Sequence, residues 1–297
     1  AFSPDGSRVA VYGRRPESDA VVRVWQLEDM IEVATLPIGE NPGFGYVEFL
    51  PNGNEILASQ KNALALWNVD ATVPEGTLPH KRQYSIFDVS KDGRAMVSVH
   101  VDDTLLVWDL ESHKFVKTAK SPDGRLFSVA IHPDGRRVAA AGERCTVFVW
   151  DLDDLDKEPV RYEHGGGPIW RLAYSPDGKT LASCSGSVVK LWTPGSHEAS
   201  ETIETGMKIV CTAAFSADGH VLAISGDDAS EADDRSALSN RILLRDLAKD
   251  RTLAEFSSHV KGVTQLEFSS TGKLGVLSSG KAVSIWDVTE VLDGVAL

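Results

Sequence analysis

The sequence predicts an all-β protein, a seven-bladed β-propeller of four-stranded antiparallel blades. The first observation is a turn of the Ser-Pro-Asp-Gly type that occurs seven times, with glycines Gly6, Gly53, Gly93, Gly135, Gly178, Gly219 and Gly272. These glycines are 47, 40, 42, 43, 41 and 53 residues apart, and a period of about 40–45 residues is typical of a propeller blade. The second observation is an apolar strand ending in Trp, which follows six of the seven turns.

The third repeat shows the predicted order of elements. Residues 85–89 form a short first strand, and Gly93 supplies the positive φ of a tight turn. Residues 94–99 form the second strand and 105–110 the third, which is a continuous apolar run. Such a run indicates a strand buried on both faces, so each blade lies between two neighbours. The alternating residues 114–117 are expected at the outer edge.

The whole chain is predicted to form one domain, 1–297, because a blade buries its faces only against other blades. The approximate repeats are 1–38, 39–79, 80–120, 121–163, 164–205, 206–258 and 259–297. A second Ser-Pro-Asp-Gly, at residues 121–124, lies too close to Gly135 to open a blade of its own.

The two chain ends lead to a further expectation. Ala1-Phe2 resembles the tail of a strand, so the chain is expected to be a fragment of a longer protein. After Trp286 the residues offer no convincing strand. The seventh blade is therefore predicted to be incomplete at its outer strand, which an upstream segment would supply.

These repeats resemble the WD-repeat family of β-propellers. Trp-Asp pairs begin at Trp108, Trp150 and Trp286, whereas Arg245 takes the Trp position in the sixth repeat. The resemblance implies a structural hydrogen-bonded set in the third repeat, made of His80, Ser98, Asp102 and Trp108. In the fifth repeat His164, Ser183 and Trp192 are kept, but Gly186 replaces the Asp.

Composition restricts the function classes. The net charge of −13 disfavours nucleic-acid binding. The chain holds no apolar segment long enough to span a membrane and no visible signal peptide. Its three cysteines, Cys145, Cys184 and Cys211, lie in different repeats and form no CxxC pair. A disulfide framework is thus not expected, which favours a cytoplasmic location.

Three patterns invite a chemical interpretation, and each has a plainer one. His80, Ser98 and Asp102 suggest a Ser-His-Asp triad, but no nucleophile elbow accompanies them. The run from His164 to Gly167 resembles an esterase oxyanion loop and is read as a Gly-rich loop between blades. The acidic run 227–234 lacks the spacing of a calcium loop. No catalytic residue, metal or cofactor is therefore predicted.

Partner-binding candidates lie on the face that carries the loops entering the blades, which the family calls the top. They are Arg14, Arg15, Phe44, Lys81, Arg82, Trp170 and Lys208. Trp170 is also compatible with packing between blades, and the sequence slightly favours this packing role over partner binding. Two lengthened loops, 13–20 and 226–240, belong to the same face and are either functional or disordered.

The sequence accordingly predicts a noncatalytic, monomeric scaffold that binds proteins or peptides on its top face. Two alternatives stay open. One is a small-molecule-binding or hydrolytic propeller enzyme, and the other is a regulatory or sensor domain fused to a catalytic domain.

Overall fold

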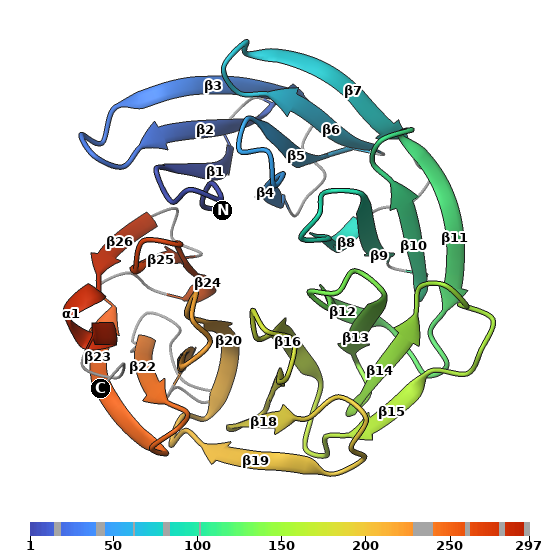
Figure 1. The fold of residues 1–297 in the computed structure, drawn as a ribbon, viewed down its shortest axis with the longest axis vertical. Coiled ribbons are helices and arrows are strands. Elements are labelled where there is room, and N and C mark those ends of the chain that lie inside the picture. Colours follow the sequence, from blue (N-terminus) through green and yellow to red (C-terminus); the bar gives the residue numbers. More distant parts are fainter. Residues whose placement is uncertain are drawn as a thin grey trace. The chain divides into compact units, whose positions relative to one another are not determined.

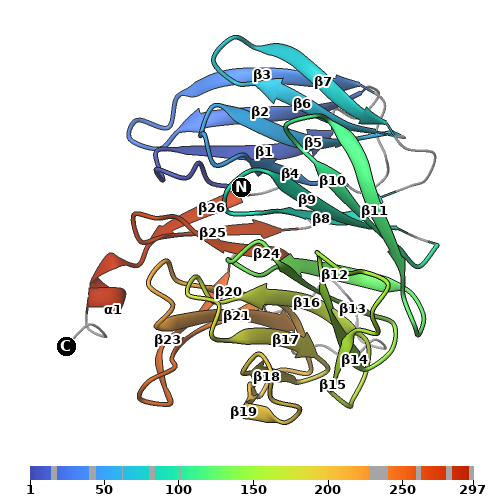
Figure 2. The same cartoon turned by 45° about the vertical axis from the view of Figure 1, so that its right-hand side comes forward.

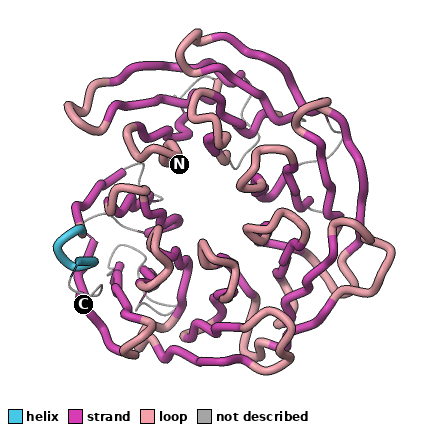
Figure 3. The backbone as a smooth tube through the Cα atoms, viewed as in Figure 1, coloured by secondary structure: helices cyan, strands magenta, loops and turns pink. Residues whose placement is uncertain are grey.

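The computed structural model describes residues 1–14, 19–39, 45–61, 63–79, 84–100, 102–227, 240–258, 262–278 and 283–293. Within these ranges α1 (Thr289–Asp293) is the only helix, and all other regular structure is strand (Figure 3). The predicted fold class is confirmed. The chain is all-β, its seven antiparallel sheets are the blades of a β-propeller, and the seventh has three strands.

The chain divides into two compact units, residues 1–138 with 150–158 and residues 139–149 with 159–297. The first unit contains the first three sheets (Figure 1). Their strands are β1 (Arg8–Arg14), β2 (Ala20–Gln26), β3 (Glu32–Gly39), β4 (Val47–Phe49), β5 (Glu55–Gln60), β6 (Ala63–Asn68), β7 (Val73–Pro79), β8 (Tyr84–Val89), β9 (Ala95–His100), β10 (Thr104–Asp109) and β11 (Lys114–Lys120).

The second unit contains the last three sheets. Their strands are β16 (Ile169–Tyr174), β17 (Leu181–Ser185), β18 (Val188–Trp192), β19 (Ala199–Glu204), β20 (Ile209–Phe215), β21 (Val221–Asp227), β22 (Asn240–Asp246), β23 (Arg251–Ser258), β24 (Val263–Phe268), β25 (Lys273–Ser278) and β26 (Val283–Asp287). The fourth sheet, through which the division runs, consists of β12 (Leu126–Ile131), β13 (Arg137–Gly142), β14 (Thr146–Asp151) and β15 (Val160–Glu163).

The repeated turn joins the first two strands of each sheet and satisfies its own polar groups. In the fifth sheet the Ser175 hydroxyl donates to Asp177 (2.7 Å) and accepts from the Thr180 N–H (3.0 Å). Asp177 also accepts from the Lys179 N–H (3.0 Å), and Gly178 adopts a φ of 72°. Ser, Asp and Gly are therefore needed for separate reasons, which is why the motif recurs.

The proline of one turn packs on the glycine of the next. A Cβ placed on Gly93 would lie 3.1 Å from Cδ of Pro51, and one on Gly219 would lie 3.5 Å from Cδ of Pro176. These contacts place neighbouring turns side by side along one edge of the sheets. We call this the bottom edge, and the opposite edge, where each first strand begins, the top edge.

The third strands of the third, fifth and sixth sheets pair on both sides, and their pairing with the outer strand is interrupted at the Trp position. The register shifts between Val107 and Trp108 where β10 pairs with β11, and between Leu191 and Trp192 where β18 pairs with β19. In the sixth sheet the same shift occurs before Arg245. Such a bulge bends the strand and increases its local twist.

Side chains from adjacent sheets interleave to form the core. In the first unit, one apolar cluster joins strands β1–β3 to β4–β6 and includes Val22, Ile56 and Trp67. Figure 2 shows these two sheets lying next to each other. In the second unit, a comparable cluster joins the fifth sheet to the sixth. The predicted burial of the third strands on both faces follows from this stacking.

Two features near the chain ends match the sequence expectations, namely the strand-like Ala1-Phe2 and the absence of a fourth strand from the seventh sheet among the described residues. Phe2 bridges to Val9, and the backbones of Ala1 and Ala10 exchange hydrogen bonds of 2.8 and 2.9 Å, so Ala1-Phe2 extends the first sheet. After β26 the described chain forms α1 rather than a fourth strand. Val291 and Leu292 of α1 pack against the apolar cluster of the sixth and seventh sheets. The three-stranded seventh blade is thus confirmed.

Candidate partner-binding site

The most exposed aromatic side chain on a top edge is Trp170 among the described residues, and a bulge in β16 places it there. Ile169 pairs with Ser185 and Arg171 pairs with Cys184, so the register shifts by one residue at Trp170. Its neighbours Ile169 and Leu172 are buried, whereas Trp170 is 47% exposed. Bulges re-aim side chains in this way. Of the two sequence interpretations of Trp170, packing between blades does not describe a side chain that is nearly half exposed.

The loop before β16 is held by hydrogen bonds to the buried Ser185. The Ser185 hydroxyl accepts from the Gly167 N–H (3.2 Å) and donates to the Gly167 carbonyl (2.7 Å). Gly165 and Gly166 have φ values of 74° and 89°, which glycine adopts readily. The loop that leads to Trp170 is therefore anchored on β17.

His164 at the start of this loop is buried, and both of its ring nitrogens face backbone carbonyls. Nδ1 lies 2.9 Å from the Gly165 oxygen, and Nε2 lies 3.2 Å from the Ser183 oxygen. Burial is the main cause that lowers the pKa of His164 below 6.5. The Ser183 hydroxyl accepts from Nε1 of Trp192 (2.8 Å). The geometry thus gives His164 a structural role and does not provide a base for a nucleophile.

Lys208 lies on the top edge of the neighbouring sheet, directly before β20. Its side chain is exposed, and its N–H donates to the Asp227 carbonyl (2.9 Å). The preceding Met207 is buried, and its N–H donates to the Thr205 hydroxyl (3.1 Å). Strands β16 and β20 pack together, so Trp170 and Lys208 are on the same edge of two adjacent sheets. Trp is one of the residue types enriched in binding hot spots.

The polar set predicted for the third sheet is described only in part. Nε1 of Trp108 donates to the Ser98 hydroxyl (3.3 Å), and Nε2 of His100 lies 3.1 Å from the same hydroxyl. Asp102 accepts from the Thr104 hydroxyl (2.5 Å). His80 lies outside the described residues.

The sequence interpretation did not consider His100. The signal was its position two residues after Ser98, which puts both side chains on one face of β9. Ser98 and His100 are completely buried, so a substrate has no access to this hydroxyl. A Ser-His-Asp reading therefore lacks the exposed nucleophile that it needs.

The remaining predicted residues add little to the described site. Arg14 ends β1 with its backbone opposite Ala20, and its side chain is not described. Arg15, Phe44, Lys81 and Arg82 lie outside the described residues, as do residues 15–18 and 228–239 of the two lengthened loops. In the described part of the chain, no three His, Cys, Asp or Glu side chains are grouped so that they could hold a metal ion. The three cysteines are free thiols.

Arg245 fills the Trp position of the sixth sheet with polar contacts. Its guanidinium pairs with Asp250 and donates to the Thr252 hydroxyl (3.4 Å). Burial raises the pKa of Glu201 on the preceding outer strand, and the nearby Asp250 raises it further, whereas Arg245 lowers it. A charged network thus replaces the indole at this position.

Seven antiparallel sheets, with bulged third strands and a repeated turn at the bottom edge, define the class of protein as a β-propeller. Three stretches match the family model "WD domain, G-beta repeat", namely residues 113–151, 157–193 and 250–287. Each matched stretch contains the outer strand of one sheet and the first three strands of the next. The chain therefore contains WD repeats.

Curated relatives support this assignment. An uncharacterized WD repeat-containing protein of Schizosaccharomyces pombe is 29% identical over 198 residues, which cover 65% of this chain and 31% of that protein. The guanine nucleotide-binding protein subunit beta of the same yeast is 29% identical over 105 residues, 35% of this chain and 34% of that protein.

A transcriptional corepressor of Arabidopsis thaliana, LEUNIG_HOMOLOG, is 23% identical over 293 residues, 96% of this chain and 34% of that protein. In each of these three comparisons the matched region is about a third of the relative's length. Among the described residues, the structure contains no helix of the length and hydropathy that crossing a membrane requires.

Proposed function

We propose that this chain is a noncatalytic scaffold for protein–protein interaction and that partners bind the top edges of its sheets. The observation that carries the proposal is Trp170, which is 47% exposed on a rigid strand. An exposed indole on an anchored element is costly to leave in water and binds with little loss of conformational entropy. Lys208 on the neighbouring sheet adds a cation to the same surface.

The names of two relatives fit this role, because a subunit and a corepressor both act together with other molecules. The net charge of −13 supports proteins or peptides as the partners rather than nucleic acid. We further propose that the chain acts as a monomer in the cytoplasm and that no membrane takes part. The three free cysteines support a reducing compartment.

Quantitative capture of partners by an immobilised Trp170→Ala variant tests the proposal. Phe115→Ala is the matched control, because Phe115 on the outer strand β11 is 49% exposed and is not on a top edge. We expect the Trp170→Ala variant to capture at least tenfold less partner protein than the wild type captures. Its melting temperature should be unchanged. Equal capture by the wild type and by both variants would rule out the top edge at Trp170 as the binding surface.

A further inference from the structure

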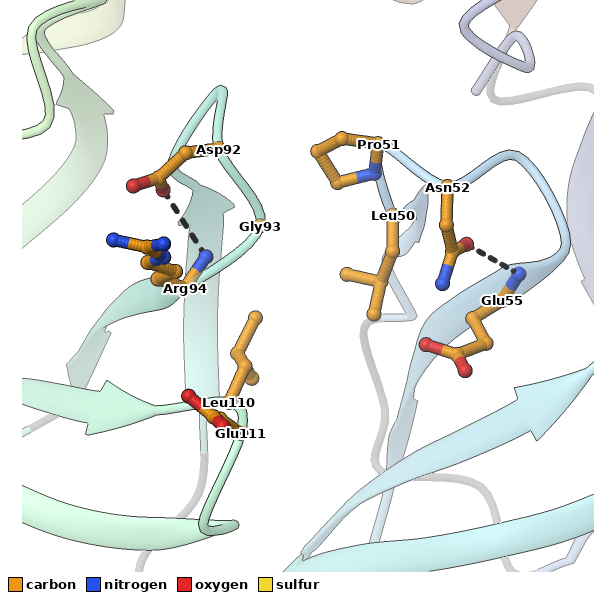
Figure 4. A pocket seen from close by; sticks show the side chains of 9 residues that line it. All are labelled: Leu50, Pro51, Asn52, Glu55, Asp92, Gly93, Arg94, Leu110 and Glu111. Atoms are coloured by element: carbon orange, nitrogen blue, oxygen red, sulfur yellow. Dashed lines mark hydrogen bonds between the residues drawn. The ribbon is translucent and has the colours of Figure 1, made fainter.

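A small cleft opens at the bottom edge between the second and third sheets of the first unit. Its volume is about 230 Å³. This is below the size of pockets that enclose drug-sized ligands, about 300–1,000 Å³, and suits a single side chain. Figure 4 shows Leu50, Pro51, Asn52 and Glu55 on one side and Asp92, Gly93, Arg94, Leu110 and Glu111 on the other.

The neighbouring pair of sheets shows what closes such a gap. Between the first and second sheets, Nη1 of Arg8 lies 2.8 Å from Oδ1 of Asp70. Arg8 follows the turn glycine Gly6 by two residues and opens β1, and Asp70 follows Trp67 by three residues. An ion pair therefore bridges these two blades at the bottom edge.

The same positions carry two carboxylates one interface further along. Glu55 follows the turn glycine Gly53 by two residues and opens β5, and Glu111 follows Trp108 by three residues. Glu55 and Glu111 thus stand at the positions of Arg8 and Asp70, and two carboxylates cannot form the ion pair found there. Neither carboxylate makes a hydrogen bond or ion pair with another described residue.

One side of the cleft carries an apolar side chain where several other repeats have a serine. Leu50 occupies the turn position that Ser3, Ser90 and Ser175 occupy elsewhere. Leu50 and Leu110 line the cleft from its two sides. In this second repeat, Leu50 stands at the position of the turn serine, and Glu55 stands at the position of the bridging cation Arg8.

The other two charged groups of the cleft lie on one side. Asp92 accepts from the Ser90 hydroxyl (2.6 Å) and from the Arg94 N–H (3.1 Å). The Ser90 hydrogen bond is the largest cause that lowers the pKa of Asp92, and the Arg94 guanidinium lowers it further. The cleft lining thus carries three carboxylates, those of Glu55, Asp92 and Glu111, against the single cation Arg94, so its formal charge is −2.

We propose that this cleft binds one basic side chain, Arg or Lys, presented by an extended peptide of a partner protein. The aliphatic part of the side chain packs between Leu50 and Leu110, and the charged head lies between Glu55 and Glu111. The inference concerns the bottom edge, so it does not depend on Trp170.

The test uses the peptide acetyl-Ala-Ala-Arg-Ala-Ala-amide, followed by methyl NMR of Leu50 and Leu110. The control peptide carries citrulline, an uncharged analogue of Arg, at the central position. We expect the Arg peptide to shift both leucines and to bind at least tenfold more tightly than the citrulline peptide. Binding should weaken as salt is added.

Three variants complete the test. Glu55→Arg recreates the Arg8–Asp70 arrangement with Glu111, so it should fill the cleft and reduce peptide affinity at least tenfold. Glu111→Gln, on an exposed turn, should weaken binding without adding a new contact. Trp170→Ala should leave peptide binding unchanged, which separates this result from the proposed top-edge function.

Three results would overturn the proposal. The first is an absence of Leu50 and Leu110 shifts with the Arg peptide, and the second is equal affinity for the Arg and citrulline peptides. The third is displacement of the peptide by equimolar Ca²⁺, because the cleft would then be a metal site instead of a side-chain pocket.

Discussion

Replacement of Trp192 by Phe tests how much one buried indole contributes to the stacked blades. Trp192 is 1% exposed on β18. Its Nε1 donates to the Ser183 hydroxyl (2.8 Å), and its ring stacks on Tyr162 with centroids 5.3 Å apart. Phe keeps an aromatic ring at this site but loses the N–H donor and part of the buried surface.

The magnitude follows from these two losses. Removing the hydrogen bond costs about 0.5–1.5 kcal/mol. Two buried ring carbons, at about 0.8 kcal/mol each, add roughly 1.6 kcal/mol. We therefore expect Trp192→Phe to lower the free energy of unfolding by about 2–3 kcal/mol. Trp286→Phe should cost less, because Trp286 is only partly buried.

The assay is urea unfolding at 25 °C followed by far-UV circular dichroism, with the same m-value for each variant. A double-mutant cycle with Ser183→Ala isolates the Nε1 hydrogen bond, and we expect a coupling of about 1 kcal/mol. A loss below about 1 kcal/mol for Trp192→Phe, or no coupling to Ser183, would refute the reasoning, because it falls short of the loss calculated from burial and the hydrogen bond.

Three other predictions concern single residues. Gly93→Ala and Gly135→Ala both place a side chain at a φ of 71°, at a cost of about 1–2 kcal/mol each. Gly93→Ala should cost about 1 kcal/mol more in urea unfolding, because its Cβ would lie 3.1 Å from Pro51, whereas a Cβ on Gly135 meets nothing within 4 Å. Equal losses would contradict this contact. Burial lowers the pKa of His164 below 6.5, so the unfolded chain takes up a proton first, and stability should fall as pH drops below about 6.5. Melting temperatures measured across this pH range should show the decline for the wild type, and the His164→Gln variant should lack it. Hydrogen bonds from the Lys179 N–H and then the Ser175 hydroxyl lower the pKa of Asp177 to about 2. The small contribution of Asp177 to the free energy of unfolding should persist above about pH 4 and disappear as the pH falls toward 2. The stability of the Asp177→Asn variant, measured during acid titration, should lack this phase.

The repeats made most of the fold predictable. Each turn uses Ser, Asp and Gly for local hydrogen bonds and backbone geometry, so a short motif is sufficient to locate it. The apolar third strands were equally clear, because burial on both faces leaves no polar alternation. The three-stranded seventh blade followed from the residues after Trp286.

The candidate site was less predictable, because it depends on contacts between elements. The exposure of Trp170 results from a bulge that the sequence does not mark. The role of His100 depends on the face of β9 that it shares with Ser98. The bottom cleft became apparent only when Glu55 and Glu111 were compared with the ion pair at the adjacent interface. Helix α1 replaces a strand through packing of Val291 and Leu292 on the sixth sheet.

Site-specific photo-crosslinking tests the central functional claim most directly. A photoreactive phenylalanine is placed at position 170 on the top edge and, in a second protein, at position 115 on an outer strand of similar exposure. We predict that the protein labelled at 170 forms discrete covalent adducts with another protein and that the protein labelled at 115 does not. Adducts at 115 with none at 170 would contradict the account.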